Sequence, residues 1–220
     1  MRPGSPCPTR PYGAGVHLLT DSIARVMFPP ACVACGADGA WVCARCAAGL
    51  RPAPPLPPPV SVAGFAAAYA YVGPAREMVA RVKYRGRHAV VPLLADAMLG
   101  AAGVASFPVP DLVTWAPTTS ARIHARGFDH ASLLARAVAT RLGVPARAVL
   151  RRPAGPAQTG RPREARLRGP VFEPRAAVPA GSRVLVVDDV VTTGATLRAA
   201  VGVLAPVAGA VYALVAARTP

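Results

Sequence analysis

Two adjacent carboxylates end an apolar run in the segment VLVVDDVVTTGATL, residues 184–197. Like charges side by side repel each other and lose hydration when they are buried. Such a pair is therefore expected where hydroxyl groups or a cation meet it. This makes Asp188 and Asp189 candidate ligands of sugar hydroxyls or, through water, of Mg²⁺.

The turn after this couplet combines hydroxyl side chains with a glycine, at Thr192, Thr193, Gly194 and Thr196. If a helix begins there, its first N–H groups and the positive end of its dipole form a cradle for a phosphate monoester. A phosphate site next to carboxylates that bind a vicinal diol describes a ribose 5-phosphate. The alternative is a strand, turn and helix with a purely structural role. That alternative does not explain why two carboxylates stand at the end of a strand.

Four cysteines form two C-x2-C pairs, Cys32 with Cys35 and Cys43 with Cys46, separated by seven residues. This spacing lets four thiolates surround one tetrahedral ion, so a structural Zn²⁺ is predicted. Two disulfides and a rubredoxin-like iron site are the alternatives. Four thiolates leave no open position for catalysis, and Cys7 is expected to be a thiol in a disordered tail.

The charge of the chain is strongly positive, with 25 basic residues against 10 acidic ones. A net charge of +15 favours polyanionic partners such as nucleic acid or phosphorylated metabolites. Every basic residue except Lys83 is arginine, however, which a GC-rich coding bias would also produce. Both interpretations stay open at this point.

Strand-like and helix-like segments alternate from about residue 60 onward. Strands are expected at residues 65–71, 111–117, 183–189 and 210–216, and helices at 73–84, 90–99, 130–142 and 194–204. Asp129 is predicted to cap the start of the third helix, and Gly143 its end. The alternation predicts an α/β fold with a mostly parallel sheet and flanking helices, whose ligands bind at the carboxyl ends of the strands.

The chain divides into three predicted parts. Residues 1–50 form a tail and the four-Cys module, residues 51–60 a proline-rich linker or a strap on the surface, and residues 61–220 the α/β domain. Residues 151–170 are expected to be a mobile basic loop. The uncharged stretch 199–217 divides into a helix, a turn and a strand, and no secretory signal precedes it, so a cytoplasmic protein without a membrane span is expected.

The segment 184–197 resembles the phosphoribosyl-pyrophosphate (PRPP) motif of type I phosphoribosyltransferases. Together with the four-Cys module it makes the chain similar to the ComF family, and four further segments carry the resemblance: MFPPACVACG at 27–36, RVKYRG at 81–86, ARGFDHASLLARAVATRLGVP at 125–145 and AQTG at 157–160. Three places depart from the family pattern. Asp129-His130 replaces Asn-Gln, Arg166 replaces Asn, and APTT at 116–119 replaces P-V-P-L.

The resemblance implies a type I phosphoribosyltransferase-like fold and a role for each matching residue. Asp188 and Asp189 would hold the ribose hydroxyls and, through water, Mg²⁺. The loop residues Thr192, Thr193, Gly194, Ala195 and Thr196 would hold the 5-phosphate, and the turn Ala116, Pro117, Thr118 and Thr119 would lie on the pyrophosphate side. The cations that would contact or close over the phosphates are Arg126, Arg161, Arg163, Arg166 and Lys83. His124 and His130 are expected to be exposed.

The resemblance also implies function. A PRPP-dependent transfer of phosphoribose to an unknown acceptor is the first expectation, linked to competence and DNA uptake or to nucleotide metabolism. A non-catalytic protein that senses PRPP or nucleotides and binds single-stranded nucleic acid is the alternative. An aromatic content of 5% argues against a base-stacking platform. The sequence leaves the oligomeric state open.

Overall fold

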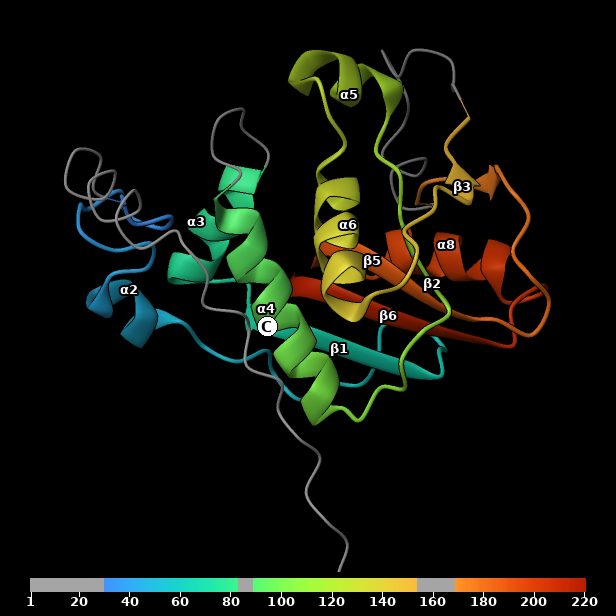
Figure 1. The fold of residues 1–220 in the computed structure, drawn as a ribbon, viewed down its shortest axis with the longest axis horizontal. Coiled ribbons are helices and arrows are strands. Elements are labelled where there is room, and N and C mark those ends of the chain that lie inside the picture. Colours follow the sequence, from blue (N-terminus) through green and yellow to red (C-terminus); the bar gives the residue numbers. More distant parts are fainter. Residues whose placement is uncertain (1–29, 83–88, 154–168) are drawn as a thin grey trace, which may run out of the picture.

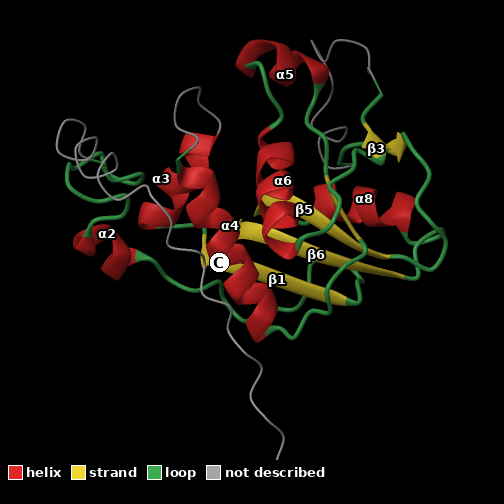
Figure 2. Ribbon diagram, viewed as in Figure 1, coloured by secondary structure: helices red, strands yellow, loops and turns green. Residues whose placement is uncertain are grey.

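The computed structural model describes residues 30–82, 89–153 and 169–220. Its centre is a four-stranded, fully parallel sheet with the strand order β1-β6-β5-β2 (Figures 1 and 2). The strands are β1 (Gly64–Ala70), β2 (Leu112–Trp115), β5 (Arg183–Val191) and β6 (Ala210–Arg218). The inner strands are buried almost along their whole length, as their unbroken apolar runs predict.

Helices cover both faces of this sheet. On one face lie α3 (Gly73–Val82), α4 (Val90–Val104) and α6 (His130–Leu142). The other face carries α8 (Ala195–Leu204). Two hydrophobic clusters, one on each side of the sheet, form the core. The predicted fold class, a parallel sheet with flanking helices, is therefore confirmed.

Most strand ends differ from the prediction by one or two residues: β1 begins and ends one residue earlier, and β5 and β6 each run two residues further. The largest difference is at α4, because the helix expected at 90–99 runs on to Val104 and Ala102 is still buried in the core. A glycine inside a helix costs about 1 kcal/mol, which continued packing offsets. The strand expected at 111–117 is restricted to its buried centre, because Pro117 has no N–H to donate.

Four short elements were not predicted. They are α2 (Ala44–Gly49), α5 (Ser120–Arg126) and the antiparallel pair β3 (Leu150–Arg151) and β4 (Glu173–Pro174). None of them is long enough to show a hydrophobic period in the sequence.

The proline-rich segment is a strap on the molecule, which we define as residues 51–62. It begins by pairing with the edge strand β1, where Ala70 N–H donates to Arg51 O at 2.9 Å. It then passes Arg218, whose guanidinium donates to Leu56 O at 2.8 Å and to Pro57 O at 2.6 Å. Val60 and Val62 pack against the same core cluster as α8. Residues 51–62 thus contact β1, Arg218 and the core cluster around α8.

The uncharged stretch 199–217 divides as predicted. Helix α8 ends at Leu204 and β6 begins at Ala210. Among the residues that the structure describes, no helix is long and apolar enough to cross a membrane.

Candidate functional site

The acidic couplet lies near the carboxyl end of β5, at the edge of the sheet where α8 begins. Asp188 and Asp189 are each only 7% exposed. Backbone amides hold one oxygen of each: Asp189 N–H donates to Asp188 Oδ1, and Val190 N–H to Asp189 Oδ1, both at 2.8 Å. The two carboxylates are thus fixed in place by their own strand.

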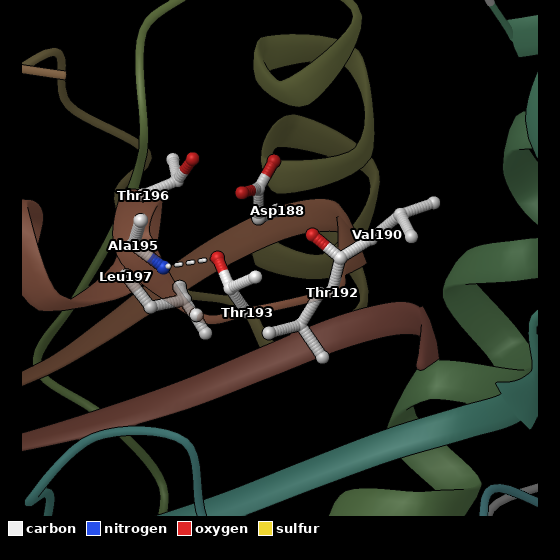
Figure 3. A pocket seen from close by; sticks show the side chains of 9 residues that line it. Asp188, Val190, Thr192, Thr193, Ala195, Thr196 and Leu197 are labelled. Atoms are coloured by element: carbon white, nitrogen blue, oxygen red, sulfur yellow. Dashed lines mark hydrogen bonds between the residues drawn. The ribbon is translucent and has the colours of Figure 1, made fainter. Parts of the chain in front are cut away.

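A small pocket of about 40 Å³, open to solvent, adjoins Asp188. Its remaining lining is the segment 190–197, which includes all three threonines of the predicted phosphate loop (Figure 3). Gly194 caps α8 in a left-handed conformation with φ of 75°, and Ala195 N–H donates to Thr193 Oγ1 at 3.4 Å. The helix therefore presents its positive end to a pocket that also holds a carboxylate.

The pKa of Asp188 is raised well above its ordinary value. Burial is the largest cause, and the neighbouring carboxylate of Asp189 is the next, with a smaller contribution from Asp129. A cation or a hydroxylated ligand at the pocket would relieve this cost. The surroundings of Asp188 therefore fit a site for Mg²⁺ and sugar hydroxyls.

Asp189 has a different environment, because His130 at the start of α6 contacts it. His130 Nε2 lies 3.2 Å from Asp189 Oδ2, and the histidine is only 7% exposed. The expectation that His130 is exposed was therefore wrong: it lies in the first turn of a helix that packs on β5, and this turns it toward the carboxylate. His124, in contrast, is exposed as expected.

The predicted pyrophosphate-side turn, residues 116–119, is tied to the same helix start. Asp129 caps α6 by accepting from Ala131 N–H, and its second oxygen accepts from Thr118 N–H, both at 3.1 Å. Thr118 is buried. One carboxylate thus fixes the turn after β2 relative to α6, beside the couplet on β5.

The predicted cations are only partly placed. Arg126 lies at the end of α5, where the structure describes the backbone alone. Lys83, Arg161, Arg163 and Arg166 fall outside the described residues.

The four cysteines of the two C-x2-C pairs form one cluster. Their four sulfur atoms lie within 4.8 Å of one another, and Cys35 Sγ is 3.7 Å from Cys43 Sγ. Thiolates about 2.3 Å from a zinc ion at the centre of a tetrahedron lie about 3.8 Å apart. All four are free thiols in the structure, so the donor set fits a tetrahedral metal.

The surroundings of these thiols also favour a thiolate cluster. Burial acts to raise the pKa of Cys32, but backbone N–H groups, among them that of Cys43 at 3.4 Å, lower it to about 6. The pKa of Cys46 is raised to about 12 by burial and by the neighbouring thiols. The pKa values of Cys32 and Cys46 thus shift in opposite directions, and a bound metal ion would favour the thiolate form of both.

The comparisons with known proteins agree with this geometry over part of the chain. Residues 123–217 match the family model of the phosphoribosyl transferase domain, a segment that contains α6, β5, the loop, α8 and nearly all of β6. The match supports a phosphoribosyltransferase-type segment there. No curated protein matches the chain in sequence.

Three solved structures are similar to the chain. The first, described as the allosteric regulatory enzyme of purine biosynthesis, is 22% identical with a TM-score of 0.44, over 63% of this chain and 30% of its own. An adenine phosphoribosyltransferase is 20% identical with a TM-score of 0.39, and the similarity covers 60% of this chain and 70% of that enzyme's chain. The adenine phosphoribosyltransferase of Leishmania donovani is 22% identical with a TM-score of 0.35, and the similarity covers 56% of this chain and 49% of that enzyme's chain.

Proposed function

We propose that the protein binds PRPP with Mg²⁺ at the pocket beside Asp188 and is a phosphoribosyltransferase. The observation that carries the proposal is the joint lining of one pocket by a buried carboxylate and the start of α8. The family match over residues 123–217 supports it, since that segment contains the whole pocket.

The residues suggest how such a transfer would proceed. The loop 192–196 binds the 5-phosphate at the helix start, while Asp188 and Asp189 orient the ribose hydroxyls. As pyrophosphate leaves, C1 of the ribose becomes oxocarbenium-like, and the departing charge needs neutralisation. Mg²⁺ would supply part of it, and we assign the rest to Arg126, Arg161, Arg163, Arg166 and Lys83, with the turn 116–119 on the pyrophosphate side.

His130 belongs to the proposed site as well. Its contact with Asp189 Oδ2 limits how that carboxylate can turn, while Asp188 lines the pocket. We therefore propose that Asp188 makes the principal ribose contact and that Asp189 is held in place from α6.

Three finer assignments complete the proposal. The four-Cys cluster holds a structural Zn²⁺. Residues 1–50 act as the tail with the zinc module, residues 51–60, within the strap, as the proline-rich connection, and residues 61–220 as the catalytic domain. The resemblance to the ComF family extends the function to competence and DNA uptake. A non-catalytic PRPP sensor that binds single-stranded nucleic acid is the alternative to an enzyme.

The test is calorimetric titration of PRPP with Mg²⁺ into wild type and Asp188→Asn. We expect at least tenfold weaker binding by the variant, because a charge-assisted contact contributes about 1.5–3 kcal/mol. Asp96→Asn is the matched control, since Asp96 forms a surface ion pair with Arg141 on α4 and α6. Equal affinities of wild type and Asp188→Asn would contradict the assignment.

Release of pyrophosphate with a panel of amine and nucleobase acceptors then separates the two functions. An enzyme releases pyrophosphate only when its acceptor is present. Binding of PRPP without release under every acceptor would favour the sensor.

A further inference from the structure

The proline strap contacts the loop that we assign to the phosphate. Pro59 lies so close to Gly194 that a Cβ on the glycine would be 2.5 Å from Pro59 Cβ. Real Cβ atoms do not approach this closely, so residue 194 must be glycine for the strap to lie where it does. Pro59 is not among the residues that line the pocket beside Asp188. The strap therefore contacts a side of the loop that does not face that pocket.

Arg198 connects the same two segments. Its Nη1 donates to Pro59 O at 2.9 Å and to Thr193 O at 2.8 Å. The residue lies in the first turn of α8, where a positive charge opposes the helix dipole. Arg198 also does not line the pocket. A contact that joins strap and loop gives this cation a structural use at an otherwise unfavourable position.

The contact with Thr193 O determines where the next amide points. In a trans peptide the carbonyl oxygen and the following N–H point in opposite directions. Holding Thr193 O against Arg198 therefore directs Gly194 N–H away from Arg198. Because glycine tolerates positive and negative φ about equally, this peptide could otherwise rotate at little cost. The φ of 75° at Gly194 is one of two accessible orientations.

We propose that Arg198 and Pro59 are positioning residues of the phosphate site, which hold the Thr193–Gly194 peptide with its N–H toward the bound phosphate. This inference rests on the proposed function. The strap is firm enough for the purpose, because it is anchored on both sides of Pro59. Arg218, stacked on Phe65 at 5.3 Å, holds Leu56 O and Pro57 O, and Ala63 N–H donates to Val211 O at 2.8 Å.

The test measures the affinity for ribose 5-phosphate, which carries the phosphate of interest and no pyrophosphate. Wild type, Arg198→Ala, Arg198→Gln and Pro59→Ala are titrated calorimetrically with Mg²⁺ present. We expect about tenfold weaker binding for Arg198→Ala, the scale of one lost hydrogen bond. We expect about threefold weaker binding for Pro59→Ala, because loss of the pyrrolidine ring frees the backbone of the strap at residue 59. Arg198→Gln keeps an N–H donor without the charge and is expected to fall between wild type and Arg198→Ala. Arg76→Ala, which removes an exposed arginine of α3, is the matched control and is expected to bind as wild type does.

The outcomes separate this inference from the proposed function. Failure of wild type to bind ribose 5-phosphate or PRPP would overturn the proposed function, and the inference with it. Normal binding by Arg198→Ala would overturn the inference alone. A large loss in Arg198→Ala with none in Pro59→Ala, and with Arg198→Gln equal to Arg198→Ala, would show that Arg198 contacts the phosphate by its charge and is no positioning residue. Should Arg198→Ala fail to fold, Arg198→Gln and Pro59→Ala decide between these outcomes.

Discussion

At the residue scale, Asp188 has an environment that suits a ligand better than it suits the fold. The carboxyl group is buried beside a second carboxylate, and both effects raise its pKa. A raised folded-state pKa means that stability is full below the ordinary value of 3.8 and is lost as the pH rises toward the folded-state pKa. The burial of Asp188 beside a second carboxylate therefore costs stability at neutral pH in the absence of ligand.

Replacement of Asp188 by asparagine is expected to raise the melting temperature of the ligand-free protein at pH 7. The amide keeps an acceptor for Asp189 N–H and removes the buried charge. Each kcal/mol of relief corresponds to about 2–4 °C for a chain of this size. Melting curves between pH 4 and 8, without Mg²⁺, should show that the gain shrinks as the pH falls. A lower melting temperature of Asp188→Asn at pH 7 would contradict this account.

The sequence indicates these two carboxylates because an apolar run comes directly before them and a turn rich in threonine follows them. His130 gives no such signal: it follows an N-cap residue, and only the packing of α6 on β5 brings it to Asp189. Arg198 and Pro59 are 139 residues apart in sequence, and nothing in either segment predicts their contact. The chemistry of the site is thus predictable from the residue types within one short segment. Its supporting contacts join segments far apart in the sequence and depend on the tertiary structure.

At the element scale, one side chain at the start of α6 has two structural roles. Asp129 caps the helix and also anchors the turn 116–119 through Thr118 N–H. The predicted cap is confirmed, and so is Gly143 as the left-handed residue that ends the helix. The bounds 130–142 agree with the structure because both ends have cap residues that can be identified in the sequence.

Asp129→Ala is expected to destabilise the protein by about 1–2 kcal/mol, the usual cost of removing an N-cap acceptor. Asp129→Asn keeps one acceptor oxygen for Ala131 N–H, but its NH2 group cannot accept from Thr118 N–H, so an intermediate loss is expected. Urea denaturation of both variants measures the difference. Equal losses would contradict a stabilising role for the cap hydrogen bond that asparagine retains.

A misleading end signal accounts for the helix end that differs most from the prediction. Gly100 resembles a stop in the sequence, so the predicted helix ends at residue 99, whereas α4 runs on to Val104 and still packs on the sheet. The short elements α5 and β3 are set by their surroundings and have no periodic pattern of their own.

At the scale of the whole molecule, the four-Cys cluster is part of the main core. Cys32, Val33, Ala34 and Cys46 belong to the same hydrophobic cluster as residues of α3 and α4, and Arg81 Nη2 donates to Ala34 O at 3.1 Å. In Figure 1, α2 of this module and α8 lie at opposite ends of the long axis, and the strap runs between these regions. Loss of the proposed zinc would therefore disturb more than the four-Cys module.

Metal analysis is expected to find about one zinc per chain, and a strong chelator should lower the melting temperature. Cys35→Ser and Cys46→Ser should each lose zinc and at least about 3 kcal/mol of stability, because metal binding and folding are coupled in such clusters. Cys7→Ser is the control and should keep both. Substoichiometric zinc with unchanged melting would contradict a structural metal.

The strand order has a consequence for any dissection of this protein. β6 lies between β1 and β5, although β1 precedes it in the chain by about 140 residues, and the segment 123–217 contains neither β1 nor β2. A fragment cut at those bounds would present two unprotected, strongly apolar sheet borders to solvent, an arrangement that promotes aggregation. The portion that carries the proposed chemistry is accordingly not an autonomous folding unit.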